Sequence, residues 1–434
     1  MEFGRSTNIT YFFATKARDI IFLDISRRKN FDFVCFMAIV QLYRYNVWFS
    51  IIKNTFIIKS EFILMIHNDA KRAFLYPTMR CNLKCAICYS GAHKPIVQER
   101  MKEELTFEEY KMVVDKLYGM GVRIFDISGG EPLLCEFIYD LIRYIKSYRD
   151  TQIYLVSNGT LIEKELSKIA EVITMIDRFQ ISIDSSNKEI HDEMRGVKGT
   201  FERAVKGIQL LQSLNYDGIG INSVITSRNE STVIELLNFA KKMNLSRVQL
   251  LRFIDVVEKQ QNVNHNVEKD DYMKIYYIVS EWVKKYKNTK LQKNLSIELV
   301  LPGCLWRESL KIPKTRVVTS NNISLYVQYD PFHGCPAFKN SIVITAYGDI
   351  TGCTGLVNIK DFHCGNIKEE SVQGMEEKFS KKIQFIKERE EYLKTKEPCS
   401  KCKEYNSCKG GCIAATYNYY GNTGYADPTC IQHA

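Results

Sequence analysis

Three cysteines lie within eight residues of this chain, in the pattern C-x3-C-x2-C: Cys81, Cys85 and Cys88. Thiolates at this spacing can bind three corners of a cubane 4Fe–4S cluster, which leaves the fourth iron without a protein ligand. Such an open iron can bind a substrate or cofactor that chelates it. Zinc is the alternative, because His93 could supply the fourth ligand of a tetrahedral site.

A second group of seven cysteines follows residue 330, and its central part reads C-x2-C-x5-C-x3-C. Its members are Cys335, Cys353, Cys399, Cys402, Cys408, Cys412 and Cys430. The group is large enough to bind further iron–sulfur clusters. No signal peptide precedes it, so we expect a cytoplasmic location, where disulfides are disfavoured. The two groups together predict a redox enzyme.

The bulk composition is that of an ordinary globular protein. The chain has 434 residues, enough for two or three domains, and is 45% hydrophobic and 25% charged. The net charge of +10 suits an acidic peptide partner or a lysine-rich solvated surface. No dense Lys/Arg tract indicates nucleic-acid binding. The apolar run Phe33–Tyr43 is too short to cross a bilayer, so no membrane span is expected.

Residues 1–64 differ in composition from the rest. They hold 14 aromatic residues, about twice the frequency of the whole chain, and follow neither a helical nor a strand period. We expect residues 1–70 to be an N-terminal extension. It is either a small leader-binding or packing domain, or the product of a start codon placed too far upstream, with Met65 as the true start.

From about residue 72 the hydrophobic pattern alternates between short strands and helices, which predicts a parallel sheet. The expected strands are 73–77, 122–128, 152–157, 178–184, 218–226 and 248–253. The expected helices are 106–120, 137–148, 161–172, 201–214, 230–243 and 272–287. Thr106 and Glu109 have the spacing of a capping box at the start of the first helix.

Segments that could carry chemistry lie at the carboxyl ends of the expected strands. They are Cys81–Cys88, Gly129–Pro132, Ser157–Gly159 and Ser182–Asp184. Ligands of parallel sheets bind at the carboxyl ends of the strands, so one shared site is predicted there.

After about residue 300 the alternation stops, and we expect a loop-rich region stabilised by metal clusters. A hairpin is predicted at 341–353, with its turn at Gly348-Asp349, and a helix at 374–395. The expected boundaries are therefore 71–300 for an α/β core and 301–434 for a cluster-binding domain.

The first cysteine loop, Cys81-Asn-Leu-Lys-Cys85-Ala-Ile-Cys88-Tyr89, followed by Gly129-Gly130-Glu131-Pro132, resembles the radical S-adenosylmethionine (radical SAM) enzymes. The resemblance covers residues 72–300. It implies a partial (β/α)6 barrel in which SAM chelates the open iron. Cleavage of SAM would then yield methionine and a 5′-deoxyadenosyl radical that abstracts hydrogen from the substrate.

The resemblance also implies contacts with SAM. The segment that meets the amino group of SAM is matched by Gly129, Gly130, Glu131 and Pro132, and the arginine that pairs with its carboxylate is matched by Arg195. Positions near the adenine are matched by Ile87, Tyr89 and the backbone of Leu250–Arg252. Contacts to the methionine and ribose are matched by Ser157, Asn158, Ser182 and Asp184. Turn formation, packing, helix capping and a surface ion pair are the ordinary alternatives for these residues.

The second cysteine group resembles the SPASM extension of radical SAM enzymes, which usually holds two auxiliary clusters, expected here as 4Fe–4S. By resemblance, an outer cluster takes Cys399, Cys402, Cys408 and Cys430, and an inner one takes Cys335, Cys353 and Cys412. Relatives have a further cysteine shortly before the position of Cys335. Here either Cys304 closes the inner cluster or an iron stays open to a substrate thiolate. The expected structural cysteines are Cys35, Cys135 and Cys364.

The resemblance favours maturation of a ribosomally made peptide by a radical cross-link. A thioether is the first expectation and a carbon–carbon bond the second. The expected partners are a precursor peptide and an electron donor of the flavodoxin or ferredoxin type. One alternative is formylglycine formation in a sulfatase, with Asp330 as a base, and another is a non-catalytic electron carrier. The substrate itself is not encoded in any motif.

Overall fold

The computed structural model describes residues 10–14, 20–24, 71–254, 267, 269–286, 294–302, 317–320, 322–330 and 335–430. Residues 1–69 and 70–434 form two units. In the first unit, β1 (Thr10–Ala14) pairs antiparallel with β2 (Ile20–Asp24). The expectations for Met65, Cys35 and Cys304 lie outside the described residues.

The second unit is built on one open sheet, with eleven strands in the described part of the chain. The strands are β3 (Lys71–Leu75), β4 (Val122–Ile127), β5 (Gln152–Ser157), β6 (Arg178–Ser182), β7 (Ile219–Ile225), β8 (Arg247–Arg252), β9 (Leu295–Pro302), β10 (Val317–Ser320), β11 (Ile323–Asp330), β12 (Ser341–Ile344) and β13 (Ile350–Thr351). Their order is β10-β11-β9-β8-β7-β6-β5-β4-β3-β12-β13. The strands from β12 to β11 are parallel, and β10 and β13 run antiparallel to their neighbours. The six predicted strands are β3 to β8, so the predicted α/β partial barrel is confirmed.

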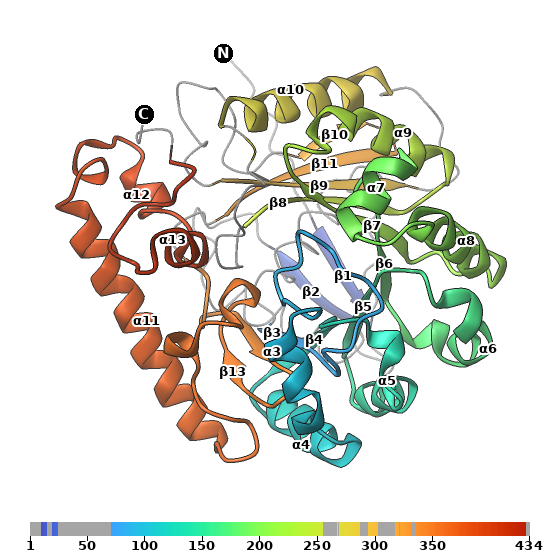
Figure 1. Cartoon of the computed structure of the whole chain (residues 1–434), viewed down its shortest axis with the longest axis horizontal. Coiled ribbons are helices and arrows are strands. Elements are labelled where there is room, and N and C mark those ends of the chain that lie inside the picture. The colour runs from blue at the N-terminus through green and yellow to red at the C-terminus, as the bar shows by residue number, and fades with distance from the viewer. Residues whose placement is uncertain are drawn as a thin grey trace. The chain divides into compact units, whose positions relative to one another are not determined.

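Helices cover one face of this sheet, following one another along its outer side (Figure 1). They are α4 (Phe107–Gly119), α5 (Ile138–Ser147), α6 (Ile162–Val172), α7 (Lys188–Arg195), α8 (Thr200–Ser213), α9 (Val233–Lys242) and α10 (Lys269–Lys285). Alternate strand residues, such as Ala73, Phe125 and Phe179, are buried against them in the main core. Six helices match the predictions, and α7 was not predicted. The capping box is confirmed, because the Thr106 hydroxyl accepts the N–H of Glu109 and the Glu109 carboxylate accepts the N–H of Thr106.

The alternation was expected to stop near residue 300, and the strands β9 and β11 were not predicted. β9 continues the sheet beside β8, and β11 pairs in parallel with β9. Ile323, Leu325 and Val327 of β11 are buried, whereas the alternating Ser324 and Tyr326 are partly exposed. This period of two is a strand pattern, and it was missed because no regular helical pattern separates β9 from β11.

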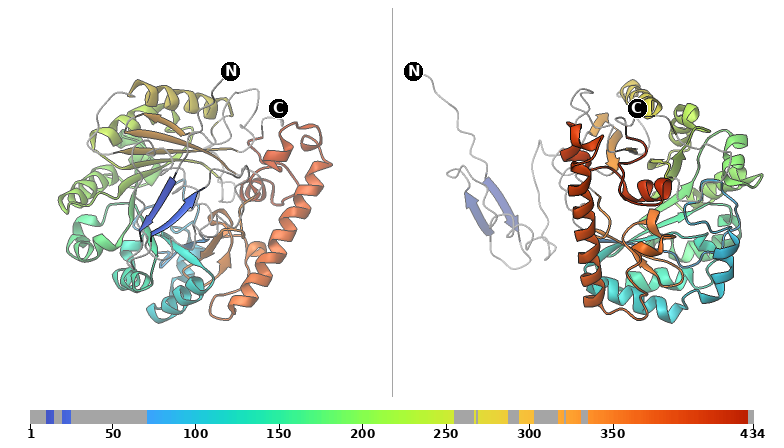
Figure 2. Two further views of the ribbon diagram at one scale, coloured as in Figure 1. Left: turned by 180° about the vertical axis from the view of Figure 1, so that it is seen from behind. Right: turned by 60° about the vertical axis from the view of Figure 1, so that its left-hand side comes forward.

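The C-terminal part adds strands to the other edge of the sheet. β12 pairs in parallel with β3, and β12 and β13 form the predicted hairpin. The predicted helix is α11 (Val372–Lys394), and Figure 2 shows it running along one side of this unit. The short helices α3 (Pro95–Glu99), α12 (Tyr405–Cys408) and α13 (Ile413–Tyr420) lie in the loop-rich segments. Among the described helices, none is long and apolar enough to cross a membrane.

Candidate active site

The first cysteine loop begins after β3 and is held by backbone contacts on two sides. On one side, Gly130 N–H donates to the Thr78 carbonyl at 2.9 Å. Glu131 N–H donates to the Arg80 carbonyl at 2.8 Å. A Cβ atom on Gly130 would lie 2.3 Å from the Arg80 carbonyl oxygen, so only glycine fits this approach. The segment Gly129–Pro132 therefore fixes the start of the loop.

On its other side the cysteine loop is held by the C-terminal end of α7, and we call these two sets of backbone contacts the clamp. Lys84 N–H donates to the Arg195 carbonyl at 3.2 Å. Ala86 N–H donates to the Met194 carbonyl at 3.1 Å. Gly196 ends the helix with φ of 69°, and a Cβ atom there would lie 2.3 Å from the Lys84 carbonyl oxygen. The loop is thus bonded to two separate strand-to-helix connections.

Glu131 joins the loop entrance to the end of β5. Its buried carboxylate accepts hydrogen bonds from the Ser157 hydroxyl (2.8 Å), Asn158 N–H (2.8 Å) and Leu133 N–H (3.2 Å). Burial raises the pKa of Glu131 to about 6, although these hydrogen bonds oppose the shift. The side chain therefore works as a structural bridge.

Asn158 continues this network to the cysteine loop. Its amide donates to the side-chain oxygen of Asn82 at 2.9 Å, and Asn82 donates to the Thr160 hydroxyl at 2.8 Å. In this structure the side chains of Ser157 and Asn158 thus support Glu131 and Asn82. Their direct contacts with SAM stay predictions.

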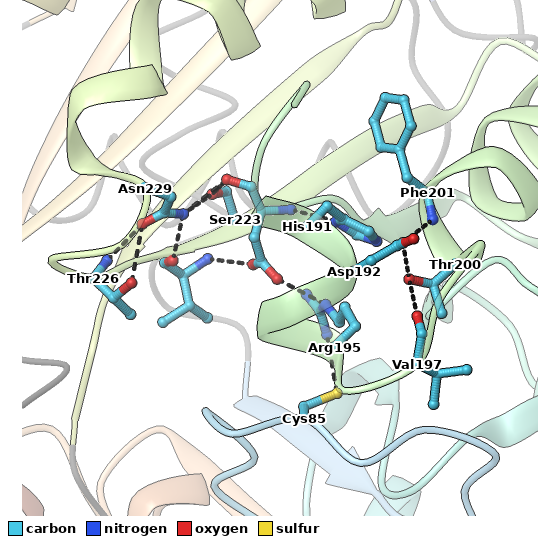
Figure 3. Close-up of polar contacts among 12 residues, drawn as sticks. Cys85, His191, Asp192, Arg195, Val197, Thr200, Phe201, Ser223, Thr226 and Asn229 are labelled. Atoms are coloured by element: carbon cyan, nitrogen blue, oxygen red, sulfur yellow. Dashed lines mark hydrogen bonds and ion pairs between the residues drawn. The ribbon is translucent and has the colours of Figure 1, made fainter. Parts of the chain in front are cut away.

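Arg195 of α7 points toward Cys85 of the first cysteine loop (Figure 3). Its Nε lies 2.7 Å from Asp184 Oδ2, and its Nη1 lies 3.9 Å from Cys85 Sγ. Asp184 also accepts Val224 N–H at 3.1 Å, and its carboxylate has no exposed surface. Burial alone would lower the pKa of Arg195, but Asp184 and Cys85 outweigh it and raise that pKa. The pair holds a cation beside one cysteine of the loop.

His191 supports the same ion pair. Its Nδ1 accepts the backbone N–H of Asp184 at 3.2 Å, and the side chain is buried. Burial lowers the pKa of His191 to about 4, and the charge of Arg195 adds to the shift. His191 is therefore neutral at pH 7 and serves as an acceptor.

The loop fits a site for a 4Fe–4S cluster. Cys81, Cys85 and Cys88 all carry free thiols and are partly exposed residues. Arg195 supplies a positive charge that balances thiolate charge beside Cys85. In the described part of the chain, no three His, Cys, Asp or Glu side chains converge as ligands of a single ion do. The thiolates of a cubane bind separate irons and lie farther apart.

Two tyrosines connect this loop with the C-terminal region. The Tyr76 hydroxyl donates to that of Tyr89 at 3.1 Å. Burial raises the pKa of Tyr76, and Tyr89 raises it further. Cys88 and Tyr89 pack against the small apolar cluster that contains Tyr76. Asn358 donates to the Tyr89 carbonyl at 3.0 Å. The first cysteine loop therefore contacts the C-terminal region through Asn358.

The second cysteine group falls into two packing environments. One is a small apolar cluster around Leu393 and Tyr405, which contains Cys399, Cys402 and Cys430. The main core contains Cys335, Cys408 and Cys412, and both Cys353 and Cys430 pack against it. Cys430 therefore contacts both environments, and the division departs from the predicted outer set at Cys408 and Cys430.

Arg389 of α11 is a buried guanidinium beside these cysteines. It donates to the carbonyls of Thr423 (2.9 Å), Gly410 (3.1 Å) and Tyr425 (2.9 Å). Burial lowers its pKa, and the nearby Cys335 is the first of several groups that oppose the shift. Arg389 thus supports the backbone that carries the last cysteines.

A buried ion pair ties the last cysteines to the barrel. Arg252, at the end of β8, donates through both Nη atoms to Asp427 at 3.1 Å, and each side chain is only 2% exposed. The Asp427 carboxylate also accepts the N–H groups of Cys412 (2.9 Å) and Thr429 (3.0 Å). Its carbonyl accepts Cys430 N–H at 2.8 Å. One aspartate therefore positions two predicted cluster ligands against a barrel strand.

The structure brings the predicted site residues together at the carboxyl ends of the strands. The cysteine loop follows β3, Gly129–Pro132 follows β4, and Ser157–Asn158 stands at the end of β5. Ser182 ends β6 and is partly exposed. The sequence reading missed supporting residues: Asn82, Thr160, His191, Arg389 and Asp427. Only Asp427 had a usable signal, because it stands three residues before Cys430.

Two family models match the chain. The radical SAM superfamily matches residues 75–240, and SPASM, an iron–sulfur cluster-binding domain, matches residues 335–403. Among the curated relatives, the AdoMet-dependent heme synthase of Methanosarcina barkeri is 26% identical, over 82% of this chain and 94% of the relative. Mycofactocin maturase MftC of Mycobacterium tuberculosis is 25% identical, over 82% of this chain and 81% of the relative.

Solved structures share the fold. Streptococcus suis SuiB has a TM-score of 0.63 at 16% identity, over 97% of this chain and 98% of SuiB. The SuiB structure bound to the precursor peptide SuiA has a TM-score of 0.62 at 15% identity, over 92% of this chain and 87% of SuiB. Native anSMEcpe with bound AdoMet has a TM-score of 0.61 at 21% identity, over 83% of this chain and 95% of anSMEcpe.

The chain therefore belongs to the radical SAM enzymes that carry a C-terminal SPASM domain. A radical SAM domain implies a 4Fe–4S cluster and SAM, and a SPASM domain binds iron–sulfur clusters. Peptide maturases are among its relatives.

Replacing Gly130 with Ala should loosen the cysteine loop, because the new methyl group would overlap the Arg80 carbonyl oxygen. We expect Gly130→Ala to lose roughly 1–3 kcal/mol of stability and to hold less iron per chain. Gly119→Ala is the control, because a Cβ atom there has open space. Equal iron contents in the two variants, measured on anaerobic protein, would contradict the clamp.

Breaking the Arg252–Asp427 pair should be strongly destabilising, because one buried charge loses its partner. We expect Asp427→Ala to cost roughly 3–5 kcal/mol. The double variant Arg252→Met with Asp427→Ala should have a higher melting temperature than the summed decreases of the two single variants predict. The exposed Arg143–Glu171 pair is the control and should show almost no coupling in melting temperature. Strict additivity at Arg252 and Asp427 would count against the pair.

His191 should make the protein less stable in acid. Its pKa is about 4 in the folded protein and about 6.5 in the unfolded chain. The neutral His191 therefore contributes fully to the free energy of unfolding above pH 6.5. This contribution is lost as the pH falls toward 4, and the loss is about 1.4 kcal/mol at pH 5.5. His191→Asn, which keeps an acceptor for Asp184 N–H, should flatten the melting temperature between about pH 7.5 and 5.5. Other titrating groups are common to both proteins, so an unchanged slope would refute this role.

Proposed function

We propose that this enzyme matures a ribosomally made peptide by installing a radical cross-link. A thioether between a cysteine sulfur and a carbon is the first choice, and a carbon–carbon bond is the second. The observation that carries the proposal is the attachment of the SPASM cysteines to the barrel through Arg252 and Asp427. This contact keeps auxiliary redox groups close to the strand ends where a substrate would react. The relationship to a mycofactocin maturase supports a peptide substrate, and SuiB, which shares the fold, has been solved with its precursor peptide.

In the proposed reaction, SAM bound at the first cluster supplies a 5′-deoxyadenosyl radical that abstracts a hydrogen atom from the peptide. Cys81, Cys85 and Cys88 bind three irons of that cluster. Backbone acceptors of Gly129–Pro132 orient the amino group of SAM, and Arg195 orients its carboxylate. The adenine lies by Tyr89, and the polar groups that end β5 and β6 hold the rest of the cofactor.

In the proposed enzyme the second cysteine group would hold two auxiliary 4Fe–4S clusters, which would supply an acceptor for the electron left after hydrogen abstraction. The outer one takes Cys399, Cys402, Cys408 and Cys430, and the inner one takes Cys335, Cys353 and Cys412. Either Cys304 or a substrate thiolate provides the remaining inner ligand. Cys399 belongs to one small apolar cluster, and Cys402 and Cys430 pack against it, which supports these three members of the outer set.

Cys304→Ala tests the remaining ligand of the inner cluster. If Cys304 is that ligand, the variant should hold less iron per chain and show an altered cluster spectrum. Cys364→Ala is the matched control, because Cys364 is buried but belongs to neither set. If Cys304→Ala keeps the iron content and spectrum of the parent protein, the substrate-thiolate alternative is favoured.

The reaction class is tested with reduced, reconstituted protein and SAM, using a flavodoxin- or ferredoxin-type donor. We expect 5′-deoxyadenosine, and its absence would refute the radical mechanism in favour of an electron carrier. Co-expression with a cysteine-containing precursor peptide encoded beside the gene should lower the peptide mass by two hydrogens per link. An unchanged peptide mass with active SAM cleavage would refute the substrate assignment alone.

A second candidate is modification of a tetrapyrrole, because the relatives include an AdoMet-dependent heme synthase at 26% identity. Conversion of an iron porphyrin in the same assay would favour it. Formylglycine formation stays an alternative on fold likeness to anSMEcpe, and conversion of a sulfatase peptide would identify it. Asp330, which ends β11, is its proposed base.

A further inference from the structure

On the face of the sheet opposite the covering helices, polar side chains of four neighbouring strands lie side by side. Register pairing places Ser182 of β6 beside Asn222 of β7. It places Gln249 of β8 between Asn222 and Glu298 of β9. All four residues are partly exposed, whereas the alternating Ile221 is buried in the main core. Solvent therefore reaches this row of polar groups.

The orientation of Asn222 is fixed by a buried glutamine on the neighbouring strand. Gln180 Nε2 donates to Asn222 Oδ1 at 2.9 Å. Gln180 can lean toward β7 because its register partner there is Gly220, where a Cβ atom would overlap Gln180 Oε1. Among the described residues, none accepts a hydrogen bond from Asn222 Nδ2. Asn222 therefore presents N–H donors to the inner face.

Gln249 is oriented in the opposite sense by Glu298. The Glu298 carboxylate forms an ion pair with Arg247 of β8, so it is charged and can only accept hydrogen bonds. Gln249 Nε2 donates to this carboxylate at 3.1 Å. In the described part of the chain, no group donates to Gln249 Oε1. Gln249 therefore presents an acceptor to the inner face.

Asn222 and Gln249 thus place a donor and an acceptor on adjacent strands, which lie about 4.8 Å apart. A carboxamide has a carbonyl acceptor and an N–H donor on neighbouring atoms, so it can bond to both residues at once. A carboxylate has no N–H for Gln249, and an ammonium group has no acceptor for Asn222. The pair is therefore selective for an amide.

The pair lies close to the first cysteine loop. Val224, two residues after Asn222 on the same face of β7, packs against a small apolar cluster that contains Ile87 of the loop. The Val224 N–H also donates to Asp184 at 3.1 Å. Two residues of a strand span about 7 Å, so a group bound at Asn222 lies near the site predicted for SAM.

We propose that Asn222 and Gln249 form a substrate subsite that binds one carboxamide, either a main-chain peptide bond or the side chain of an Asn or Gln residue. The subsite deepens the proposed function and rests on it for the peptide substrate. Val224 and Leu251, which are paired in register and partly exposed, provide apolar contacts beside the bound amide. The subsite holds the peptide on the inner face, beside Ser182.

The subsite is tested by binding, which does not require catalysis. Saturation-transfer NMR on the anaerobic holoprotein uses two probes, N-acetyl-Gly-Asn-Gly-amide and N-acetyl-Gly-Gly-Gly-amide. We expect a dissociation constant of about 1–10 mM. Asn222→Asp keeps the acceptor for Gln180 but removes the donor. Gln249→Met removes the acceptor, while Glu298 keeps its ion pair with Arg247. Each variant should bind about fivefold more weakly, as expected for one lost hydrogen bond.

Two matched controls make the same changes away from the barrel. Gln384→Met removes a comparable contact on α11, where Gln384 donates to Glu388 at 3.0 Å. Asn406→Asp changes an exposed amide on α12. Both controls should bind the probes as the parent does. Asn222 and Gln249 lie on different strands, so either variant tests the pair if the other does not fold.

The proposal is overturned if both subsite variants bind the probes as tightly as the parent, or if neither probe binds the parent at up to about 50 mM. Tighter binding of the Asn peptide identifies a side-chain amide, and equal binding of the two probes identifies a main-chain amide. Coproporphyrin III has carboxylates but no carboxamide. If its binding were lost in both variants, the pair would be a tetrapyrrole site and the amide proposal would be overturned. If the precursor peptide keeps its mass while the pair still binds amides, the proposed function fails and the subsite stands.

Discussion

The proposed chemistry depends on a short loop that is held by main-chain hydrogen bonds on both sides. Gly130 and Glu131 bind its entrance, and the end of α7 binds its middle at Lys84 and Ala86. Because main-chain atoms make these bonds, the three cysteine side chains are not needed to shape the loop. The backbone path of the loop is therefore set by bonds that do not involve iron, which lowers the ordering cost of binding it.

The same electrostatic arrangement occurs twice in this fold. At the first cysteine loop, Arg195 lies beside Cys85 and is held by the buried Asp184. At the second group, Arg252 is held by Asp427, which also binds the backbone of Cys412. In each case a buried carboxylate holds an arginine from a barrel element; at the first group the arginine approaches a cysteine, and at the second the carboxylate itself binds a cysteine N–H. Loss of either partner would leave a charge in a poorly solvated place, so both pairs are strong constraints on local structure.

Much of the fold could be predicted from the sequence because its signals are local. Cysteine spacing, the β/α alternation, the Thr106 capping box and the 341–353 hairpin are all patterns within short windows. The supporting network could not be predicted in this way, because Asn82 meets Asn158 and Arg252 meets Asp427 across long stretches of chain. Asp184 shows the same limit. Its position at a strand end is visible in the sequence, whereas its pairing with Arg195 depends on where the unpredicted helix α7 is placed.

The strand order also constrains how the protein is made. β3 is the first strand of the large unit, yet one of its two neighbours is β12, which begins at residue 341. During synthesis from the N-terminus, one edge of β3 stays unpaired until most of the chain has left the ribosome. Exposed strand edges recruit other chains, so the nascent barrel needs protection over this interval. Since the first cysteine loop follows β3 directly, the final environment of that loop is set only when the SPASM region has been synthesised.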